Sequence, residues 1–370
     1  MKMVIAAGGT GGHLFPGIAV AEVMRDIYSD IKITFVGTER GIEQEILQRE
    51  GLDHQVLRVG RIKGEGLAGK LRTVLTLPRS LWQAKQILDR IMPNIVFGIG
   101  GYSSGPMILA AFLLRIPRAI LEPNAIPGFT NRMLSHFVTR VFIAFPETAS
   151  FFGHRKIRLT GTPVRKNLNS QLRRSVDNSL SNSPGNFQRH FHIVVLGGSQ
   201  GARSLNEAMI KVLPLLERSE RPFKVTHQTG TRDYERIKEA YERSLVEHEV
   251  QSFIKDMASL YHQADLVVGR SGASTVAELI ETQTPCVLVP YPFAADDHQR
   301  YNAQSIVNAG GGEMLLRGHL EEKLGERILY LASHEEELKR MRENLSKMRK
   351  IPAAQAVARE CLELMHVSNS

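Results

Sequence analysis

The sequence predicts an α/β protein of two Rossmann-like domains, and three observations carry this prediction. The chain has 370 residues, enough for two domains that each bury a core. Short β-branched runs alternate with amphipathic stretches of helical length, the pattern of parallel βαβ units. A strand that leads into a glycine loop and a helix occurs twice, starting its loops at Gly8 and Gly197. This repeat favours tandem domains that face each other across a cleft.

Two sets of strands can be placed along the chain. The first set is Met3–Ala7, Lys32–Val36, Asn94–Ile99, Arg118–Leu121 and Arg140–Ala144, and the second is His192–Leu196, Lys224–Gln228, Asp265–Val268 and Cys286–Val289. Residues 166–190 are rich in Ser, Asn, Gln and Arg without periodicity, which predicts a flexible linker or a long surface loop. We therefore expect a first domain at 1–162 and a second at 163–345, with a C-terminal helix at about 352–368 packing back on the first.

Composition excludes several classes of protein. With 42% hydrophobic and 23% charged residues, the chain is neither disordered nor fibrous. The longest strongly apolar run, Met107–Leu114, is far shorter than the roughly 20 residues of a membrane span. The first residues resemble a strand that runs into glycines rather than a secretory signal. Cys286 and Cys361 cannot form a disulfide framework or a cysteine-based zinc site, which suits a reducing cytoplasm.

Charge is unevenly distributed along the chain. The formal net charge is +9, of which residues 1–185 carry +11 and residues 186–370 carry −2. A basic half beside a nearly neutral half indicates that one domain faces an anionic partner, with nucleic acid and acidic lipid as the two candidates. A recognition helix, an aromatic-interleaved basic strand and a zinc finger are all missing from the sequence, so the nucleic-acid candidate has no support.

Four predicted strands lead into glycine loops. These loops are Gly8–Gly12, Gly98–Gly105, Gly197–Gly201 and Gly269–Gly272. Glycine lets the backbone turn sharply and approach a ligand, and the N–H groups of the following helix favour phosphate. None of the loops contains the Gly-Lys-Ser/Thr of a P-loop, and the first does not fit Gly-x-Gly-x-x-Gly, which disfavours an oxidoreductase. Phosphate-bearing ligands are therefore expected at the carboxyl edges of both sheets.

Polar residues follow these loops at three places. Glu278 falls in the first two turns of a helix that opens at Ser271-Gly272, where it is either an ordinary helix-start charge or the acceptor of vicinal ribose hydroxyls. The polar run Asp296–Asn302 follows a proline-rich turn and is expected to line a site. His13 stands at a helix start, where the cationic imidazole is disfavoured, so its neutral form is suited to a general base.

At these residues the chain resembles the MurG family, bacterial glycosyltransferases that add N-acetylglucosamine to the undecaprenyl-linked peptidoglycan precursor. The matching strings are Gly8–Gly17, Gly100–Pro106, Glu122-Pro123-Asn124 with Gly128 and Asn131-Arg132, Gly161–Arg165, Gly197–Ala202, Arg270–Glu278, and Asp297-His298-Gln299 with Asn302-Ala303. They occur in family order over about 300 residues, which makes the match specific. The chain departs from the family at Pro123, where glutamine is common, and at Leu121, where histidine is frequent.

The resemblance implies the GT-B architecture, with UDP-N-acetylglucosamine held mainly by the second domain. It places Ser199 and Gln200 at the sugar-diphosphate, Ile254 at the uracil, Glu278 at the ribose, Ala273, Ser274, Thr275 and Val276 at the diphosphate through their backbone, and Gln299 at the sugar hydroxyls. It implies that Thr10, Gly11, Gly12, Asn124 and Arg165 contact the donor from the first domain and the hinge. Tyr102 and Ser103 are expected to face the lipid-linked acceptor.

The reaction implied is an inverting transfer to the 4-hydroxyl of undecaprenyl-diphosphate-linked N-acetylmuramoyl-pentapeptide. His13 and Glu122 are the candidate bases, and we prefer His13 because imidazole titrates near the working pH. No Asp-x-Asp metal motif follows a first-domain strand, so we expect no cofactor, with helix N–H groups and Arg165 stabilising the leaving group. The alternative is another UDP-sugar enzyme on this scaffold, such as a UDP-N-acetylglucosamine 2-epimerase or a glycolipid synthase.

A membrane-facing patch is the last expectation. Leu75 and Trp82, the only tryptophan, lie among Lys70, Arg72 and Arg79. This stretch is either a core helix with solvated charges or a peripheral contact to anionic lipid, and the basic first half favours the second. We expect the protein at the cytoplasmic face of the bacterial inner membrane, in contact with the lipid-linked acceptor and other cell-wall synthesis and division proteins, and not with nucleic acid.

Overall fold

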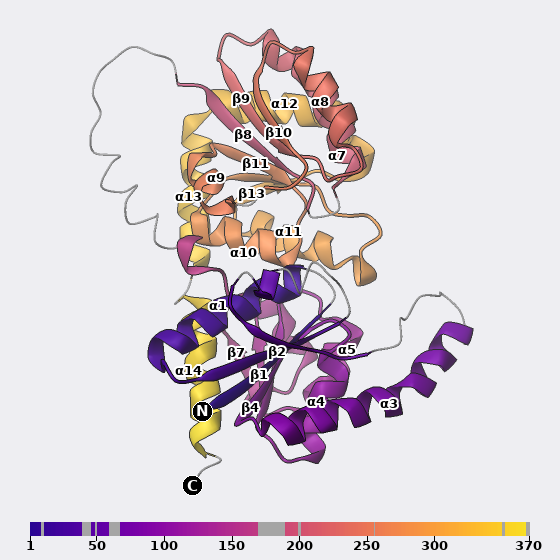
Figure 1. Cartoon of the computed structure of the whole chain (residues 1–370). Helices are drawn as coiled ribbons and strands as arrows, with labels where there is room; N and C mark the ends of the chain where they lie inside the picture. The colour runs from indigo at the N-terminus through magenta and orange to yellow at the C-terminus, as the bar shows by residue number, and fades with distance from the viewer. Residues whose placement is uncertain are drawn as a thin grey trace. The chain divides into compact units, whose positions relative to one another are not determined.

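The chain divides into two compact units, each built around its own parallel sheet (Figure 1). Unit 1 comprises Met1–Arg165 and Lys350–Ser370, and unit 2 comprises Lys166–Arg349. The computed structural model describes residues 1–8, 11–38, 46–48, 50–58, 67–168, 189–198, 201–254, 256–349 and 352–367, with the backbone alone described for 11 and 67–77. Most of the predicted linker at 166–190 lies outside the described residues.

Unit 1 contains a seven-stranded parallel sheet of order β3-β2-β1-β4-β5-β6-β7. Its strands are β1 (Lys2–Ala7), β2 (Lys32–Gly37), β3 (Asp53–Val56), β4 (Ile95–Gly100), β5 (Arg118–Glu122), β6 (Arg140–Ile143) and β7 (Ile157–Leu159). Its helices are α1 (Gly11–Ile27), α3 (Leu67–Ile91), α4 (Ser104–Leu113), α5 (Phe129–Leu134) and α14 (Ala353–Val367), with short 3₁₀ turns at Ser135–Phe137, Pro146–Phe151 and His154–Lys156. The strand order reverses between β1 and β4, which makes that position the topological switch point of the sheet.

Helices cover both faces of this sheet. Alternate residues of each strand point to opposite faces, so the central strand β1 contributes to two hydrophobic clusters. Met3 and Ile5 of β1 pack in one cluster with residues of α1 and α14. The alternate residues Val4 and Ala6 point to the other face and pack in a second cluster with residues of α3 and α4. The central strand β1 is therefore apolar on both sides, as its continuous run in the sequence predicts.

The C-terminal helix α14 belongs to unit 1 although it follows the whole of unit 2 in sequence. It lies beside α1 and buries Val357 and Cys361 completely (Figure 1). On its other side the Glu360 carboxylate accepts hydrogen bonds from Arg140 at 3.1 Å and Arg158 at 2.8 Å, and these two arginines lie on β6 and β7. The helix thus completes the core of unit 1.

Unit 2 contains a six-stranded parallel sheet of order β10-β9-β8-β11-β12-β13. Its strands are β8 (Phe191–Leu196), β9 (Phe223–Gln228), β10 (Glu247–Gln251), β11 (Leu266–Gly269), β12 (Cys286–Leu288) and β13 (Gly312–Met314). Its helices are α7 (Arg203–Glu217), α8 (Tyr234–Glu242), α9 (Met257–Gln263), α10 (Ala273–Thr282), α11 (His298–Asn308), α12 (Leu320–Ser333) and α13 (Glu335–Met348), with 3₁₀ turns at Ala295–Asp297 and Arg317–His319. Here the switch point lies between β8 and β11.

The predicted fold class is confirmed, and each predicted strand is present with its ends within one residue of the prediction. Four further strands, the two edge strands of each sheet, are not predicted from the sequence: β3, β7, β10 and β13. Edge strands are short and partly exposed, so they lack the buried apolar run that marks a central strand. Within the described residues, no helix is long and apolar enough to cross a bilayer.

Candidate functional site

The switch point of unit 1 brings the first two glycine loops into contact. Gly101 has φ of +77°, and a Cβ on it would lie 1.5 Å from the carbonyl oxygen of Gly8, so no larger residue fits there. The Ser104 hydroxyl accepts a hydrogen bond from the Gly100 N–H at 2.9 Å and lies 2.9 Å from the carbonyl oxygen of Ala6. The ends of β1 and β4 are therefore held together at the carboxyl edge of the sheet.

His13 lies at this edge, in the first turn of α1. A Cβ on Gly100 would lie 3.1 Å from the His13 Nε2 atom, so the half-buried imidazole covers a backbone position that has no side chain. Gly100 has φ of +101°, a conformation that L side chains rarely adopt. Glycine at this position is what allows the ring to lie against the end of β4.

Ser103 and Tyr102 precede helix α4 beside the same loops. The Ser103 side chain is completely buried, and its hydroxyl has no hydrogen-bond partner among the described residues. A Cβ on Gly8 would lie 2.9 Å from that hydroxyl oxygen, so the serine faces the end of β1. Tyr102 is 40% exposed. The start of α4 therefore combines helix N–H groups, an unused hydroxyl and an exposed phenol.

Glu122, the last residue of β5, is buried to 1% exposure and has both carboxylate oxygens engaged. One oxygen accepts from the backbone N–H of Asn124 at 3.0 Å and its side-chain amide at 3.1 Å, and the other from the N–H of Gly128 at 3.1 Å and the amide of Asn131 at 2.9 Å. Burial raises the pKa of Glu122, and these four hydrogen bonds act in the opposite direction. Glu122 thus joins both ends of the loop at 123–128 and the following helix through hydrogen bonds to its carboxylate.

Arg165, at the end of the first part of unit 1, lies against α1. Its guanidinium stacks on the Phe15 ring with 4.3 Å from Cζ to the ring centroid, and it approaches Glu50 at 3.8 Å. Phe15 is two residues after His13, so the arginine is held near the start of the same helix. Thr10 lies outside the described residues, and Gly11 and Gly12 form the first turn of α1.

The switch point of unit 2 has the same construction. Gly201 has φ of +74°, and a Cβ on it would lie 2.2 Å from the carbonyl oxygen of Thr229, so this loop touches the turn after β9. The Gln228 amide joins two loops, because it donates to the carbonyl oxygen of Gly198 at 3.0 Å and accepts from the N–H of Ile254 at 3.2 Å. Ser199 and Gln200 lie outside the described residues.

The first turn of α10 presents backbone N–H groups at this edge. Gly272 caps the helix in an extended conformation, and the helix begins at Ala273. Ala273, Ser274 and Thr275 are partly exposed whereas Val276 is completely buried, so Val276 can offer a ligand only its backbone. The N–H groups of a first helical turn have no acceptor within the helix, which makes them suited to phosphate.

Glu278 lies in the second turn of α10, and Gln299 lies on the neighbouring helix α11. Glu278 is half-buried on α10, and one of its oxygens accepts a hydrogen bond from the Tyr261 hydroxyl at 2.8 Å. Gln299 lies in the first turn of α11, and its side-chain oxygen accepts from the N–H of Tyr291 at 2.9 Å. The Ser271 hydroxyl donates to the carbonyl oxygen of Gln299 at 2.7 Å, which joins the starts of the two helices.

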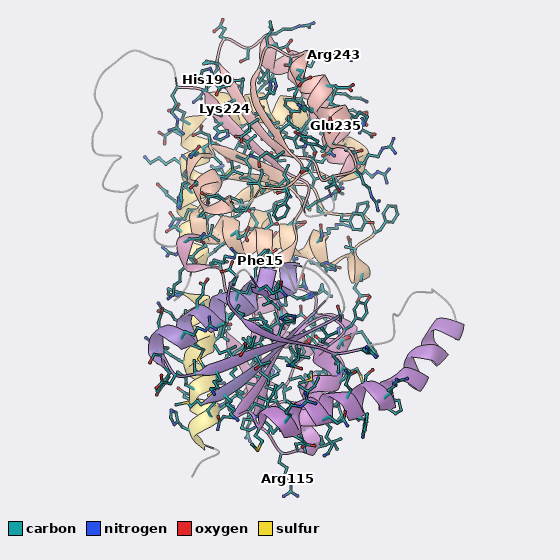
Figure 2. The ribbon with its side chains drawn as sticks, in the orientation of Figure 1. Phe15, Arg115, His190, Lys224, Glu235 and Arg243 are labelled. Carbon is teal, nitrogen blue, oxygen red and sulfur yellow. The ribbon has the colours of Figure 1, made fainter. Side chains whose placement is uncertain are left out.

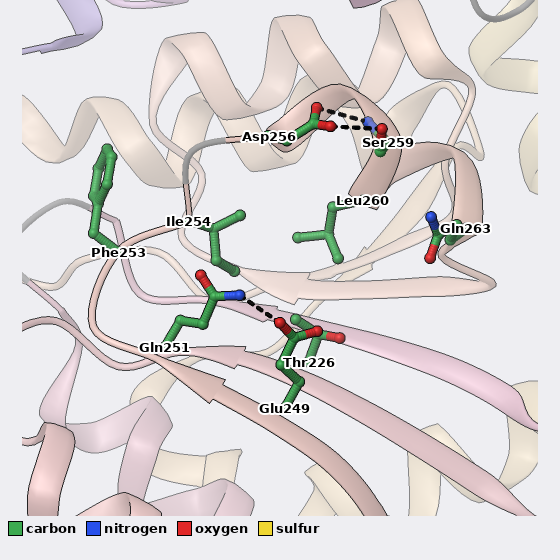
Figure 3. Close-up of a pocket in the computed structure, with 9 residues that line it drawn as sticks. All are labelled: Thr226, Glu249, Gln251, Phe253, Ile254, Asp256, Ser259, Leu260 and Gln263. Carbon is green, nitrogen blue, oxygen red and sulfur yellow. Dashed lines mark hydrogen bonds between the residues drawn. The ribbon is translucent and has the colours of Figure 1, made fainter.

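A cavity of about 490 Å³ flanks Ile254 in unit 2 (Figure 3). Ile254 and Leu260 point into it, and its floor includes Thr226 and Glu249, which stand in the middle of β9 and β10. The cavity therefore extends along a face of the sheet to the carboxyl end of β10, where Gln251 and the following Phe253 and Asp256 also line it. In the described ranges, no group of three His, Cys, Asp or Glu side chains is placed to hold a metal ion.

Two residues that connect parts of the site, Gln228 and Tyr261, are not predicted as site residues from the sequence. Gln228 is the last residue of β9 and follows the polar residues after Val225. A polar side chain at the carboxyl end of a strand indicates a site residue, so Gln228 could have been predicted. Tyr261 gives no such signal, because it lies in the middle of a short helix that follows no glycine loop or predicted strand. Only the folded chain shows that its hydroxyl meets Glu278.

Comparisons with known proteins agree with this geometry. The glycosyltransferase family 28 N-terminal domain matches residues 3–143, and the glycosyltransferase family 28 C-terminal domain matches residues 192–357. The chain therefore belongs to glycosyltransferase family 28, whose two domains correspond to the two sheets.

Several curated relatives carry the name UDP-N-acetylglucosamine–N-acetylmuramyl-(pentapeptide) pyrophosphoryl-undecaprenol N-acetylglucosamine transferase. The one from Myxococcus xanthus is 42% identical over 366 residues, covering 99% of this chain and 93% of the relative. The one from Pelobacter propionicus is 42% identical over 375 residues, covering 98% of this chain and 99% of the relative. These relatives confirm the resemblance to the MurG family.

Solved structures show the same architecture. The crystal structure of Acinetobacter baumannii MurG matches with a TM-score of 0.76 and 28% identity, covering 98% of this chain and all of that one. A UDP-GlcNAc 2-epimerase from Neisseria meningitidis bound to UDP-GlcNAc matches with a TM-score of 0.68 at 14% identity, covering 98% of this chain and all of that one. At that identity the epimerase shares the fold alone.

Proposed function

We propose that the chain transfers N-acetylglucosamine from UDP-N-acetylglucosamine to the 4-hydroxyl of undecaprenyl-diphosphate-linked N-acetylmuramoyl-pentapeptide, converting lipid I to lipid II in peptidoglycan synthesis. Relatives that carry this transferase name are about 42% identical over nearly the whole chain, which supports transfer rather than epimerisation. The structural observation that carries the proposal is the placement of Glu278 beside the open first turn of α10, an arrangement suited to a nucleoside diphosphate.

Unit 2 binds the donor. The diphosphate lies on the first turn of α10 and on the loop that contains Ser199 and Gln200, because helix N–H groups stabilise its negative charge. Glu278 accepts hydrogen bonds from the ribose hydroxyls, and the backbone of Ile254 contacts the uracil. Gln299 binds the sugar hydroxyls. These roles follow the family motif, and the proximity of the starts of α10 and α11 supports them.

His13 is the general base that takes the proton of the acceptor hydroxyl. It is half-buried at the carboxyl edge of its sheet, beside the loop that carries Tyr102 and Ser103, whose hydroxyl has no hydrogen-bond partner in the described part of the chain. Neutral imidazole accepts a proton near neutral pH, and a positioned base contributes about 10²- to 10⁴-fold to rate. The start of α4 is suited to the acceptor's diphosphate.

Glu122 holds the loop at 123–128 in place rather than taking the proton of the acceptor hydroxyl. Four N–H donors occupy its two oxygens, so proton abstraction would require one of these hydrogen bonds to break first. The same contacts orient Asn124, which we assign to the donor with Thr10, Gly11 and Gly12.

Arg165 stabilises the charge that develops on the leaving UDP, together with the helix N–H groups. Its stacking on Phe15 holds the guanidinium in place without consuming its N–H donors. We expect no cofactor in this reaction, because stabilisation of the leaving group by N–H donors replaces the role of a bound cation. Activity is therefore expected to persist when a chelator is present.

The basic half of the chain attaches to the membrane that carries the acceptor. Trp82 on α3 and Leu113 on α4 are 62% and 61% exposed, and these helices pack together. Arg79 and Arg115 are exposed beside them, and Arg115 projects away from unit 1 (Figure 2). Apolar side chains rimmed by arginine suit an anionic bilayer at the cytoplasmic face of the inner membrane. The same location gives access to other cell-wall synthesis and division proteins.

The direct test is incubation with UDP-N-acetylglucosamine and a short-chain lipid-linked muramoyl acceptor. We expect an acceptor-dependent disaccharide with inverted anomeric configuration, formed equally with and without a chelator. Release of UDP-N-acetylmannosamine without acceptor would instead identify an epimerase, and strict dependence on a divalent cation would contradict the assignment of the leaving-group charge to N–H donors.

A further inference from the structure

Tyr261 is a buried phenol whose hydroxyl reaches the carboxylate assigned to the ribose. It lies on α9 at 2% exposure, and its hydroxyl donates to an oxygen of Glu278 on α10 at 2.8 Å. The half-buried Glu278 therefore has an interior contact on one oxygen while its side chain also reaches the surface.

The backbones of the two residues are linked as well. The Thr282 hydroxyl donates to the carbonyl oxygen of Glu278 at 2.8 Å, and it lies 2.8 Å from the Thr284 hydroxyl. Thr284 in turn lies 3.3 Å from the carbonyl oxygen of Tyr261. The side-chain contact and the two threonines thus connect α9 and α10 at both ends of the Tyr261–Glu278 pair.

The phenol stays protonated over the working range of pH and so donates to the carboxylate throughout it. Burial, followed by the charge of Glu278, raises the pKa of Tyr261 well above its ordinary value. A permanently protonated hydroxyl holds one oxygen of the carboxylate in place, and a hydrogen bond to a charged group is stronger than one between neutral groups.

We propose that Tyr261 is a positioning residue for ribose recognition, which orients the Glu278 carboxylate so that it accepts hydrogen bonds from the vicinal hydroxyls. This inference rests on the proposed donor site and adds to it the residue that sets the direction of its carboxylate. Without the phenol hydroxyl, the Glu278 side chain can adopt rotamers in which its carboxylate does not reach the ribose. Nucleotide binding then weakens mainly because the hydrogen bonds from the ribose hydroxyls to Glu278 are lost.

The experiment compares UDP with 2′-deoxy-UDP by calorimetry, which needs no acceptor and no turnover. The ratio of their dissociation constants measures ribose recognition in the wild type, in Tyr261→Phe and in Glu278→Ala. The matched control is Tyr241→Phe, which removes another buried phenol hydroxyl of unit 2, one that lies 3.0 Å from the Nδ1 atom of His227. Thermal unfolding of each variant reports any purely structural loss.

We expect the wild type to prefer UDP by roughly tenfold or more, the value of one hydrogen bond to a charged group. Tyr261→Phe should lose most of that preference, with 2′-deoxy-UDP bound almost as in the wild type, whereas Tyr241→Phe should keep it even if less stable. A wild-type preference that Glu278→Ala abolishes and Tyr261→Phe retains would overturn this inference alone. Equal binding of both nucleotides by the wild type would overturn the Glu278 assignment and the inference together.

Discussion

The two units contain the same kind of sheet edge but use a carboxylate in different ways. In unit 1, Glu122 is fully buried and four N–H donors surround it. In unit 2, Glu278 is half-buried and held from inside by Tyr261. We propose that Glu122, with four N–H donors on its oxygens, shapes the loop at 123–128, and that the partly exposed Glu278 contacts the donor. On this proposal, the same sheet topology serves a structural carboxylate in one unit and a ligand-binding carboxylate in the other.

The largest expected effect concerns the base in unit 1. His13→Ala should lower kcat by about 10²- to 10⁴-fold while the donor dissociation constant stays nearly unchanged, because only the proton transfer is lost. Steady-state kinetics with saturating acceptor, together with calorimetric titration of UDP, measures both quantities. If kcat stays within a few-fold of the wild type and Glu122→Gln abolishes it, the two residues exchange roles.

The second expected effect separates a positioning carboxylate from a catalytic one. Glu122→Ala should reduce the free energy of unfolding of unit 1 by about 3 kcal/mol, because buried N–H groups lose their acceptor. Chemical denaturation followed by hydrogen exchange at β5 measures this loss. A Glu122→Ala variant that keeps wild-type stability but has no activity would show that Glu122 reacts with the substrate instead of shaping the loop.

The third prediction is that unit 1 binds the membrane and unit 2 does not. Leu75→Ser and Trp82→Ser should weaken binding to anionic vesicles without changing UDP affinity, while Leu215→Ser, at a 42% exposed position of unit 2, should leave vesicle binding intact. Attachment should also weaken with added salt, since each engaged Lys or Arg contributes about 1 kcal/mol. Cosedimentation at low and high salt is the measurement. Equal losses from the Trp82 and Leu215 variants would remove the patch from the account.

The last expected effect concerns the pH dependence of stability in the interior of unit 2. His227 is completely buried, its ring nitrogens lie 3.0 Å from the Tyr241 hydroxyl and 3.1 Å from the Asn206 side-chain oxygen, and burial lowers its pKa to about 3. Between about pH 6.5 and 3 the unfolded chain binds a proton that the folded chain does not, so stability falls as pH falls through this range, by about 1 kcal/mol per unit.

Hydrogen exchange at β9 as a function of pH checks this effect. His227→Gln should flatten the slope below pH 6.5, and the exposed His319→Gln in the same unit should leave it as in the wild type. An unchanged slope in His227→Gln would mean that another group carries the acid sensitivity of unit 2.

Prediction from the sequence succeeded where burial leaves a pattern. The central strands β1 and β8 are apolar on both faces, so each appears as a continuous run before its glycine loop. Edge strands such as β3, Asp-His-Gln-Val, carry no such run because they are partly exposed. In the site, the glycine loops and Glu278 follow from local sequence. The partnership of Tyr261 with Glu278 depends on how α9 packs on α10, and no short-range pattern records that.

The most direct test of the difference between the two carboxylates is the UDP dissociation constant of two isosteric variants. Glu278→Gln should weaken UDP binding by roughly tenfold to a hundredfold at unchanged stability, since a charge-assisted hydrogen bond to the ribose is lost. Glu122→Gln should weaken UDP binding far less than Glu278→Gln does, since it acts on the donor only through Asn124, while unfolding at a lower temperature. Calorimetric titration and thermal unfolding of both proteins would contradict the account if Glu278→Gln bound UDP normally or if Glu122→Gln alone lost it.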